Sequence, residues 1–165
     1  MGSGKSSVGK RLASRMGMKF LDSDREIEKQ QQKKIPEIFK KNGELAFRQM
    51  EKEWLQNLEV SNAIVSLGGG TPCFEGNMEL IKQKGTSIYL ILSPEAIVSR
   101  LIKSKNVRPL VEEYKNDREA LLKVVEEMLN KREVFYKRAD LHLDALSVDA
   151  DKLDQLGNII RSKED

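Results

Sequence analysis

The chain has 165 residues and a formal net charge of +3, with 33% charged and 39% hydrophobic residues. The length suits one domain over residues 1–165, and the mild, mixed charge gives no reason to expect a nucleic-acid partner. The single cysteine, Cys73, excludes an internal disulfide and fits a reducing compartment. No apolar run approaches the roughly 20 residues of a membrane span, and no heptad pattern is evident. We therefore expect a monomeric, cytoplasmic protein without membrane contact.

Hydrophobic spacing predicts helices and strands that alternate along the chain. The expected helices span residues 5–16, from Asp24 onward, 34–43, 44 to about 60, 78–84, from Pro94 onward, 117–136 and 151–160. The expected strands span residues 19–22, 62–67, 87–92 and 141–144. Gly17, Gly43 and Gly85 follow helices, where glycine commonly ends them. The charged segment 103–117 has no sustained periodicity and is expected to be a mobile loop.

Strand–helix alternation of this kind is typical of an α/β domain with a parallel sheet. The ligands of such domains bind at the carboxyl ends of the strands. Polar residues or glycines follow these ends: Asp22 and Asp24 after the first strand, three glycines after the second, and Asp144 after the last. We therefore expect the functional site along this edge of the sheet.

The amino end carries a candidate phosphate-binding loop, GSGKS at residues 2–6. Gly4, Lys5 and Ser6 fill the last three specified positions of G-x-x-x-x-G-K-[ST], whereas the first glycine would fall before Met1. In such a loop, backbone N–H groups surround a polyphosphate, the lysine reaches its β/γ oxygens and the hydroxyl reaches Mg²⁺. The alternative is a Gly/Ser-rich cap of the helix that begins at Lys5.

Two aspartates lie two residues apart just after a strand, in FLDSDREIE. Asp22 can serve a metal while Asp24 faces a substrate hydroxyl. The alternative is that these carboxylates and Ser23 only cap the following helix. The segment by itself favours neither interpretation.

Arg48 follows Phe47 in LAFRQME and lies about 100° around the helix from it. The guanidinium can therefore lie at the edge of the buried face, where it can grip a carboxylate with two hydrogen bonds. The alternative is a solvated arginine paired with Glu51 at i,i+3.

Three consecutive glycines, Gly68, Gly69 and Gly70, follow the second strand. Glycine lets the backbone approach a ligand closely, and a plain flexible turn is the alternative. Three in succession are costly in conformational entropy, which favours a functional role. Arg108 in the loop and Arg132 in the long helix are further candidate cations, although most arginines are ordinary surface residues.

Taken in order, the motifs GSGKS, D-x-D, F-R-x-x-E, G-G-G, R-P-L and K-R-x-x-x-Y resemble those of the shikimate kinases, small P-loop kinases of the nucleoside-monophosphate-kinase type. The resemblance runs from Gly2 to about Tyr136. GSGKS is shared by many ATPases, whereas the other motifs in this succession are specific to the family. The resemblance implies a three-layer α/β P-loop kinase fold with a central parallel sheet and a mobile lid at about 103–117. It also implies ATP-dependent phosphorylation of the 3-hydroxyl of shikimate, in aromatic amino-acid biosynthesis.

The same resemblance implies a role for each matched residue. ATP would contact Gly2, Ser3, Gly4, Lys5, Ser6, Ser7, Arg100 and Arg108. Mg²⁺, the expected cofactor, would be held by Ser6 and Asp22. Shikimate would contact Asp24, Arg48, Gly68, Gly69, Gly70 and Arg132, with its carboxylate between the two arginines. Lys5, Asp24 and Arg108 would act in catalysis. The loop after Asp144 lacks an arginine that some relatives carry, which leaves the adenine contacts open.

In the family, a strand at the centre of the sheet leads directly into the phosphate loop, and this sequence does not contain it. A buried strand contributes several apolar side chains at about 1.5–3 kcal/mol each, which together rival the net stability of a domain. We therefore expect that Met1 is not the natural start and that the natural chain begins roughly ten residues earlier.

Two other functions stay open at this point. One is a related small-molecule kinase such as a gluconate-type kinase, against which F-R-x-x-E and G-G-G argue. The other is a nucleotide-binding module without catalysis, which would not need Asp24 or two arginines for a carboxylate. Of the remaining residues, we expect Cys73 to be semi-buried, His142 to be a structural strand residue and Trp54 to belong to the core.

Overall fold

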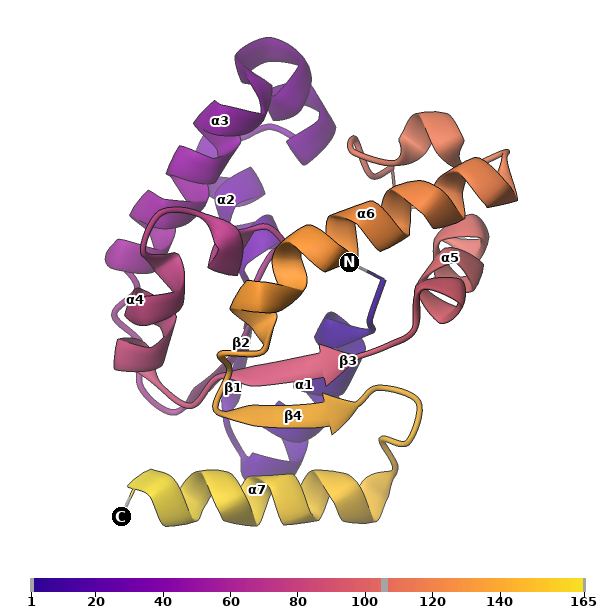
Figure 1. Cartoon of the computed structure of the whole chain (residues 1–165). Helices are drawn as coiled ribbons and strands as arrows, with labels where there is room; N and C mark the ends of the chain where they lie inside the picture. The colour runs from indigo at the N-terminus through magenta and orange to yellow at the C-terminus, as the bar shows by residue number, and fades with distance from the viewer. Residues whose placement is uncertain (1, 105–106, 165) are drawn as a thin grey trace.

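The computed structural model describes residues 2–104 and 107–164, so Met1 and residues 105–106 of the predicted lid lie outside it. Its helices are α1 (Lys5–Met16), α2 (Ser23–Gln31), α3 (Ile35–Gln56), α4 (Asn77–Lys84), α5 (Pro94–Lys103), α6 (Arg118–Tyr136) and α7 (Ala150–Glu164). Its strands are β1 (Lys19–Asp22), β2 (Ala63–Ser66), β3 (Ile88–Ile91) and β4 (Leu141–Asp144), and two 3-10 turns are η1 (Thr71–Cys73) and η2 (Glu112–Tyr114). Figure 1 shows the helices arranged around the strands. The predicted α/β class is therefore confirmed.

The strands form two parallel pairs instead of one continuous sheet. β1 pairs with β2 and β3 pairs with β4. Within the described residues no hydrogen-bonded ladder joins β2 to β3, and a cavity of about 690 Å³ extends along both strands. The predicted parallel arrangement of the strands is confirmed, and the described ladders join them as two separate pairs.

Local capping sets the ends of the helices. Gly17 has a left-handed φ of 68° after α1, and its N–H donates to the carbonyl of Ala13. The carboxylate of Asp117 accepts hydrogen bonds from the N–H groups of Glu119 and Ala120 at the start of α6. These contacts span only a few residues, so the sequence predicts them well.

Helix α3 replaces the two helices predicted at 34–43 and from 44 to about 60. It has a kink at Gly43, whose φ of 81° and ψ of 172° are not helical, so the predicted break is confirmed. The predicted end near Val60 is wrong, because the helix ends at Gln56. Leu58 still packs against the core from the turn that follows, which extended the apolar pattern beyond the helix.

The described parts of the predicted loop, residues 103–104 and 107–117, contain some regular structure. Lys103 is the last residue of α5, and η2 forms a short turn. Val111 is only 3% exposed and belongs to the same hydrophobic cluster as Leu101 and Leu121. One buried valine produces no periodic pattern, so sequence spacing does not reveal this anchor.

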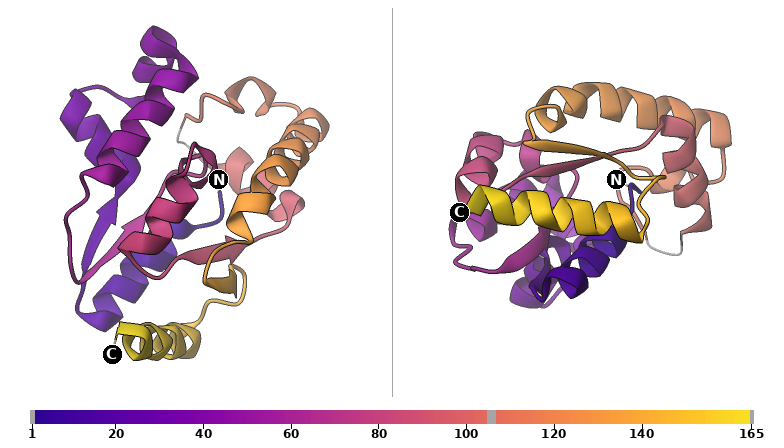
Figure 2. Two further views of the ribbon diagram at one scale, coloured as in Figure 1. Left: turned by 60° about the vertical axis from the view of Figure 1, so that its left-hand side comes forward. Right: turned by 90° about the horizontal axis from the view of Figure 1, so that it is seen from below.

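Three hydrophobic clusters hold the layers together. One joins α5 and α6 around Val98 and Leu121, and a second joins α1, β4 and α7 around Leu12 and Leu153. The third joins α2 and α3 and contains Trp54, as predicted. In the right-hand view of Figure 2, α6 and α7 lie on opposite sides of the β3–β4 pair. The β3–β4 pair is therefore covered by helices on both faces.

Candidate active site

A cleft of about 1090 Å³ opens at the carboxyl ends of β1 and β2. Its lining comes from helices α1, α2, α3 and α6 and from the segment 107–110. The loop of Gly68, Gly69 and Gly70, which we call the glycine loop, also contributes. The sequence-predicted site residues that line it are Lys5, Ser6, Asp22, Asp24, Arg48, Gly68, Gly69, Gly70, Arg108 and Arg132. Motifs that lie far apart in the sequence therefore meet in one cleft.

The amino end of α1 forms one end of the cleft, which we call the phosphate corner. Ser6 Oγ donates a hydrogen bond to Asp22 Oδ2 at 2.6 Å. Lys5 Nζ lies 3.7 Å from Asp24 Oδ2 and donates to Ser66 Oγ at 3.4 Å. The first turn of a helix presents free N–H groups and the positive end of its dipole, and Lys5 adds a full charge. This corner is therefore suited to a polyphosphate.

The pair Ser6 and Asp22 also offers two oxygen ligands of the kind that Mg²⁺ prefers. Mg²⁺ is usually bound by one or two protein oxygens together with substrate phosphates and water. Residues 2–104 and 107–164 hold no group of three or more His, Cys, Asp or Glu side chains arranged for a metal. The donors present thus fit a magnesium ion that arrives with a nucleotide.

The opposite end of the cleft, which we call the acid corner, is built around Arg48. Arg48 Nη1 donates to Glu51 Oε2 at 2.5 Å, and Nη2 donates to Glu44 Oε1 at 2.8 Å. The Glu51 side chain is fully buried, and its Oε1 accepts from Thr71 Oγ1 at 2.6 Å. The Arg48 side chain is itself only 11% exposed. Arg48 therefore pairs with Glu51 as the second alternative expected, but it is not a solvated arginine, because its side chain is buried at the wall of the cleft.

Burial and pairing oppose each other in this ion pair. Burial alone would lower the pKa of Arg48, but the carboxylates of Glu51 and Glu44 raise it overall. Burial raises the pKa of Glu51, against the opposing effects of Arg48 and Thr71. Arg48 is therefore a permanent cation held in a fixed orientation at the wall of the cleft.

Replacing Glu51 with glutamine is expected to change how stability depends on pH. The folded state binds the Glu51 proton more tightly than the unfolded chain does, because its pKa lies above the ordinary value of 4.5. This contribution to stability is present below pH 4.5 and is lost as the pH rises through the raised pKa, at about 1.4 kcal/mol for each pH unit between the two pKa values. Glu51→Gln removes the dependence, so the unfolding free energy of the variant minus that of the wild type should increase with pH. Urea unfolding from about pH 4 to about pH 8 measures this difference.

Glu53→Gln, on the exposed side of the same helix, is the matched control and should leave the pH profile unchanged. If the unfolding free energy of Glu51→Gln minus that of the wild type stays constant or decreases with pH, then burial does not raise the pKa of Glu51.

Tyr136 fastens the glycine loop to α6. Its hydroxyl donates to the carbonyl of Gly69 at 2.5 Å. Burial raises the pKa of Tyr136 to about 12, against the opposing effect of Arg132, so the hydroxyl stays protonated and can donate. Arg132 lies one turn earlier on α6 and also lines the cleft. The contact therefore sets the position of this arginine relative to the loop.

Two glycines of the loop lie where no side chain fits. A Cβ at Gly68 would lie 2.3 Å from Glu51 Oε1 and 2.9 Å from Asp24 Oδ1. A Cβ at Gly70 would lie 2.3 Å from Cζ of Arg48. The glycine requirement predicted for this loop is thus a steric one, imposed by the charged groups of the cleft.

The other predicted nucleotide residues lie beside the cleft. Arg100 Nη1 donates to the carbonyls of Ser3 at 2.7 Å and Gly2 at 3.4 Å, so its guanidinium lies against the loop backbone. Gly4 precedes α1 with a left-handed φ of 88°, and Ser7 is exposed on α1. None of these five residues is among those that line the cleft in the described part of the chain.

Arg108 reaches the cleft from the segment that follows α5. Its backbone N–H donates to Glu112 Oε2 at 3.1 Å. Its Nε is buried and has no hydrogen-bond partner among the described residues. A buried donor of this kind is costly, which suggests a group that a ligand would satisfy.

Sequence reasoning missed several residues that build the site. Glu51 was considered only as a surface partner, although the motif F-R-x-x-E contains it. Ser23 Oγ accepts from the N–H of Gly68, and the amide of Asn77 donates to the carbonyl of Thr71. Neither contact leaves a signal in the sequence, because the partners are brought together only by packing.

The cleft lies on an α/β fold and combines a phosphate corner containing Lys5 and Ser6, a carboxylate beside it, and an acid corner lined by arginine. These features define an ATP-dependent kinase of the P-loop class for a small acidic substrate. A family model for shikimate kinase matches residues 1–156. The shikimate kinase of Parabacteroides distasonis is 40% identical over 146 residues, which cover 88% of this chain and 83% of that protein. The shikimate kinase of Persephonella marina is 41% identical over 144 residues, covering 87% and 83%. The chain belongs to the shikimate kinase family.

Solved structures agree with this assignment. The shikimate kinase of Bacteroides thetaiotaomicron has a TM-score of 0.82 at 29% identity, with 99% of this chain and 93% of that chain covered. The shikimate kinase of Acinetobacter baumannii, in complex with shikimate, has a TM-score of 0.81 at 32% identity, with 99% and 87% covered.

Proposed function

We propose that the protein transfers the γ-phosphoryl group of ATP to the 3-hydroxyl of shikimate, giving shikimate 3-phosphate and ADP for aromatic amino-acid biosynthesis. The observation that carries the proposal is the single cleft in which Lys5, Asp24 and Arg48 meet. Shikimate is a cyclic acid with hydroxyl groups, so it needs a cation at one end and a carboxylate at the hydroxyl end. Membership of the family and the shikimate complex of the Acinetobacter enzyme support the same substrate.

The acid corner would bind the shikimate carboxylate through Arg48 and Arg132. Arg48 is already fixed by Glu51, so binding would require little further ordering of its long side chain. Gly68, Gly69 and Gly70 would let the ring approach the backbone beside these arginines. This arrangement positions the acceptor, which is most of what phosphoryl transfer requires of a protein.

Glu44 accepts hydrogen bonds from the two Arg48 nitrogen atoms that a substrate carboxylate would use. Its Oε1 accepts from both Arg48 Nε, at 3.2 Å, and Arg48 Nη2, at 2.8 Å. The Glu44 side chain is 48% exposed, so it can move aside into solvent. We therefore propose that Glu44 holds Arg48 in place until shikimate takes over these two donors.

Glu44→Ala is consequently expected to lower the KM for shikimate about two- to fivefold with little change in kcat, since an exposed ion pair is worth about 0.2–1 kcal/mol. Initial-rate measurements at saturating ATP give both constants. Glu53→Ala, one of the exposed carboxylates of the same helix, is the control. A KM that rises in Glu44→Ala alone would mean that Glu44 helps to bind the substrate.

At the phosphate corner, Lys5 would neutralise charge on the β/γ oxygens and Ser6 with Asp22 would hold Mg²⁺. The ion, when bound, would neutralise further charge on the phosphates. Asp24 would orient the accepting hydroxyl and take its proton as the new bond forms. Lys5, close to Asp24, would keep this carboxylate directed into the cleft.

The remaining nucleotide contacts are assigned to the loop and its neighbours: Gly2, Ser3, Gly4, Ser7, Arg100 and Arg108. We propose that the segment 103–117 closes over the nucleotide and brings Arg108 onto its phosphates, with Val111 as its anchor in the core. Closure would exclude water and so limit wasteful hydrolysis of ATP. The unpartnered Nε of Arg108 supports this role.

We further propose a monomer of one domain that acts in the cytoplasm. The substrates are small molecules, and the cleft is built from one chain. The helices of residues 2–104 and 107–164 include none with the length and hydropathy that a membrane span requires.

Tyr136→Phe tests the coupling of α6 to the glycine loop. Loss of the hydrogen bond to Gly69 is expected to destabilise the protein by about 0.5–1.5 kcal/mol. Because Arg132 then loses its fixed position, the KM for shikimate should rise about threefold to tenfold at an unchanged KM for ATP. Unfolding curves and initial rates measure the two effects, and equal changes in both KM values would indicate a general loosening instead.

The function itself is tested by coupled ADP release with MgATP in the presence and absence of shikimate, with mass detection of the phosphorylated acid. The expected result is turnover that depends on shikimate and is not supported by gluconate. Preference for gluconate would favour a sugar-acid kinase. Nucleotide binding without transfer to any acid would favour a binding module.

A further inference from the structure

The glycine loop leads into Thr71, a buried residue that contacts the acid corner. Thr71 is 0% exposed and is not among the described residues that line the cleft, so it does not face a ligand bound there. Its Oγ1 donates a hydrogen bond to Glu51 Oε1 at 2.6 Å. Hydrogen bonds from a hydroxyl to an ionised carboxylate are about 2.5–2.7 Å long, shorter than those between neutral groups. The geometry therefore fits Glu51 as a carboxylate and Thr71 as its donor.

The Glu51 carboxylate has one donor at each oxygen. Arg48 Nη1 donates to Oε2 at 2.5 Å, and Thr71 donates to Oε1. The described residues offer this side chain no third hydrogen bond, although it is fully buried and an ionised carboxylate can accept about four. A buried charge is costly unless it is paired and hydrogen-bonded. One of the two hydrogen bonds that offset the burial of this charge thus comes from Thr71.

The charged and titratable groups around Glu51 oppose each other. They come from three elements: Arg48 of α3, Asp24 of α2 and Cys73 of η1. Burial and the charge of Asp24 raise the pKa of Glu51, whereas Arg48 and the hydrogen bond from Thr71 lower it. Burial raises the pKa of the Cys73 thiol, which therefore adds no charge at neutral pH. Thr71 is thus the neutral group that shifts this balance toward the ionised carboxylate.

Backbone contacts fix Thr71 before any ligand binds. Its N–H donates to the carbonyl of Gly68 at 3.1 Å, and its own carbonyl accepts from Nδ2 of Asn77 at 2.9 Å. Asn77 begins α4 and is buried. Threonine is also stiff at χ1, because it branches at Cβ. The turn and α4 together therefore hold the hydroxyl in place relative to Glu51.

We propose that Thr71 is a positioning residue for the substrate: its hydroxyl keeps the Glu51 carboxylate ionised and directed at Arg48, so that the guanidinium is fixed for the substrate carboxylate. A hydroxyl that donates to a carboxylate stabilises the ionised form over the protonated one. Protonated Glu51 no longer forms an ion pair with Arg48, and the long arginine side chain is then held only by the exposed carboxylate of Glu44. The role of Arg48 rests on the proposed function, whereas the contact between Thr71 and Glu51 does not.

The carboxyl carbon of Glu51, followed by ¹³C NMR as the pH is varied, tests this contact on the protein without nucleotide or substrate. The chemical shift of this carbon reports protonation directly. Thr71→Val keeps the shape of the side chain and removes the hydroxyl. Its titration midpoint for Glu51 is expected to rise by about one to two pH units, which corresponds to the strength of a hydrogen bond to a charged group. Thr71→Ser keeps the hydroxyl and should titrate within about half a pH unit of the wild type.

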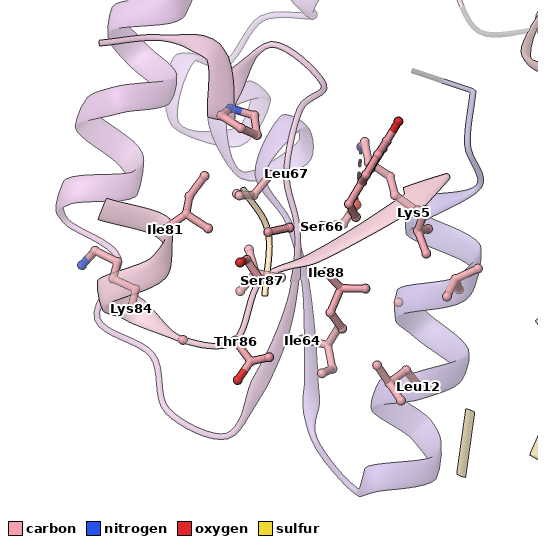
Figure 3. A pocket seen from close by; sticks show the side chains of 18 of the residues that line it. Lys5, Leu12, Ile64, Ser66, Leu67, Ile81, Lys84, Thr86, Ser87 and Ile88 are labelled. Atoms are coloured by element: carbon pink, nitrogen blue, oxygen red, sulfur yellow. Dashed lines mark hydrogen bonds between the residues drawn. The ribbon is translucent and has the colours of Figure 1, made fainter. Parts of the chain in front are cut away.

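Thr86→Val is the matched control. Thr86 is half-buried and lines the cavity along β2 and β3, but it is not among the described residues that line the cleft (Figure 3). The same change of side chain at this position should leave the titration midpoint of Glu51 and the kinetic constants unchanged.

Initial rates at saturating MgATP then show whether the ionised carboxylate positions Arg48. At a pH below both midpoints, the KM for shikimate of Thr71→Val should exceed that of the wild type about tenfold for each unit by which the midpoint rises. Above both midpoints the two KM values should converge, and the KM for ATP should stay the same throughout. A purely structural role for Thr71 would instead raise the KM for shikimate by the same factor at every pH.

Each of three results would overturn the proposal. An unchanged midpoint in Thr71→Val would mean that the hydroxyl does not support the ionised carboxylate. A midpoint that rises equally in Thr71→Ser would mean that packing, and not the hydroxyl, sets it. A raised midpoint without a pH-dependent rise in the KM for shikimate would mean that Glu51 does not position Arg48. The proposed function fails on a different result, the absence of shikimate turnover in the wild type. That result also removes the substrate role of Thr71, while the titration still decides its contact with Glu51.

Discussion

Asp24→Asn is expected to lower kcat for shikimate phosphorylation by about 10²- to 10⁴-fold, the usual contribution of a positioned proton acceptor. Asp24 lines the cleft between the phosphate and acid corners, and its Oδ2 lies 3.7 Å from Lys5 Nζ. The amide keeps the size of the side chain but cannot accept the proton of the attacking hydroxyl. The KM for shikimate should change much less, because Arg48 and Arg132 are untouched.

The measurement is initial-rate kinetics, with nucleotide affinity measured separately by calorimetry. Asp154→Asn is the matched control, since Asp154 is an exposed carboxylate that pairs with Arg15 on the surface. It should leave kcat unchanged. If Asp24→Asn retained nearly the kcat of the wild type, Asp24 would be a group that only caps α2, which was the alternative drawn from the sequence.

Gly70→Ala is expected to raise the KM for shikimate tenfold or more and to destabilise the protein by about 1–3 kcal/mol, the usual cost of overpacking. The new Cβ would lie 2.3 Å from Cζ of Arg48, whose guanidinium is held by Glu51 and Glu44. Either the guanidinium or the loop must move. Both movements disturb the group that would bind the substrate carboxylate.

Gly157→Ala provides the matched control. Its Cβ would lie 3.4 Å from the flexible side chain of Met16, in the middle of α7. Alanine there should stabilise the helix by about 0.5–1 kcal/mol without affecting the kinetic constants. Thermal unfolding and initial rates of both variants measure the contrast. A normal KM in Gly70→Ala would show that the loop can retreat and that Arg48 does not need this contact.

Much of the site follows from local sequence patterns. Three features were predicted correctly: the start of α1 at Lys5, the strand at 19–22 that ends at Asp22, and the glycines after the second strand. Each depends on periodicity, capping or chain stiffness, which act over a few residues. The order of the motifs then predicted the family, which the comparisons confirm.

Other features were decided only when the chain folded. Tyr136 reaches the carbonyl of Gly69 across 67 positions, and Glu51 meets Thr71 in the interior. Each strand was predicted nearly in place, but the pairing of β1 with β2 and of β3 with β4 was decided by the folded chain.

The sequence by itself determined which segments form helices and strands and which residues are candidates for the site. The tertiary structure decided which strands touch, which charge is buried, and which glycine has no room for a side chain. The physical reason is that helix and strand formation depends on neighbours a few residues apart. The position of Arg48 against Gly70, by contrast, depends on how α3 packs beside a loop more than 20 positions away, and no local pattern encodes that distance.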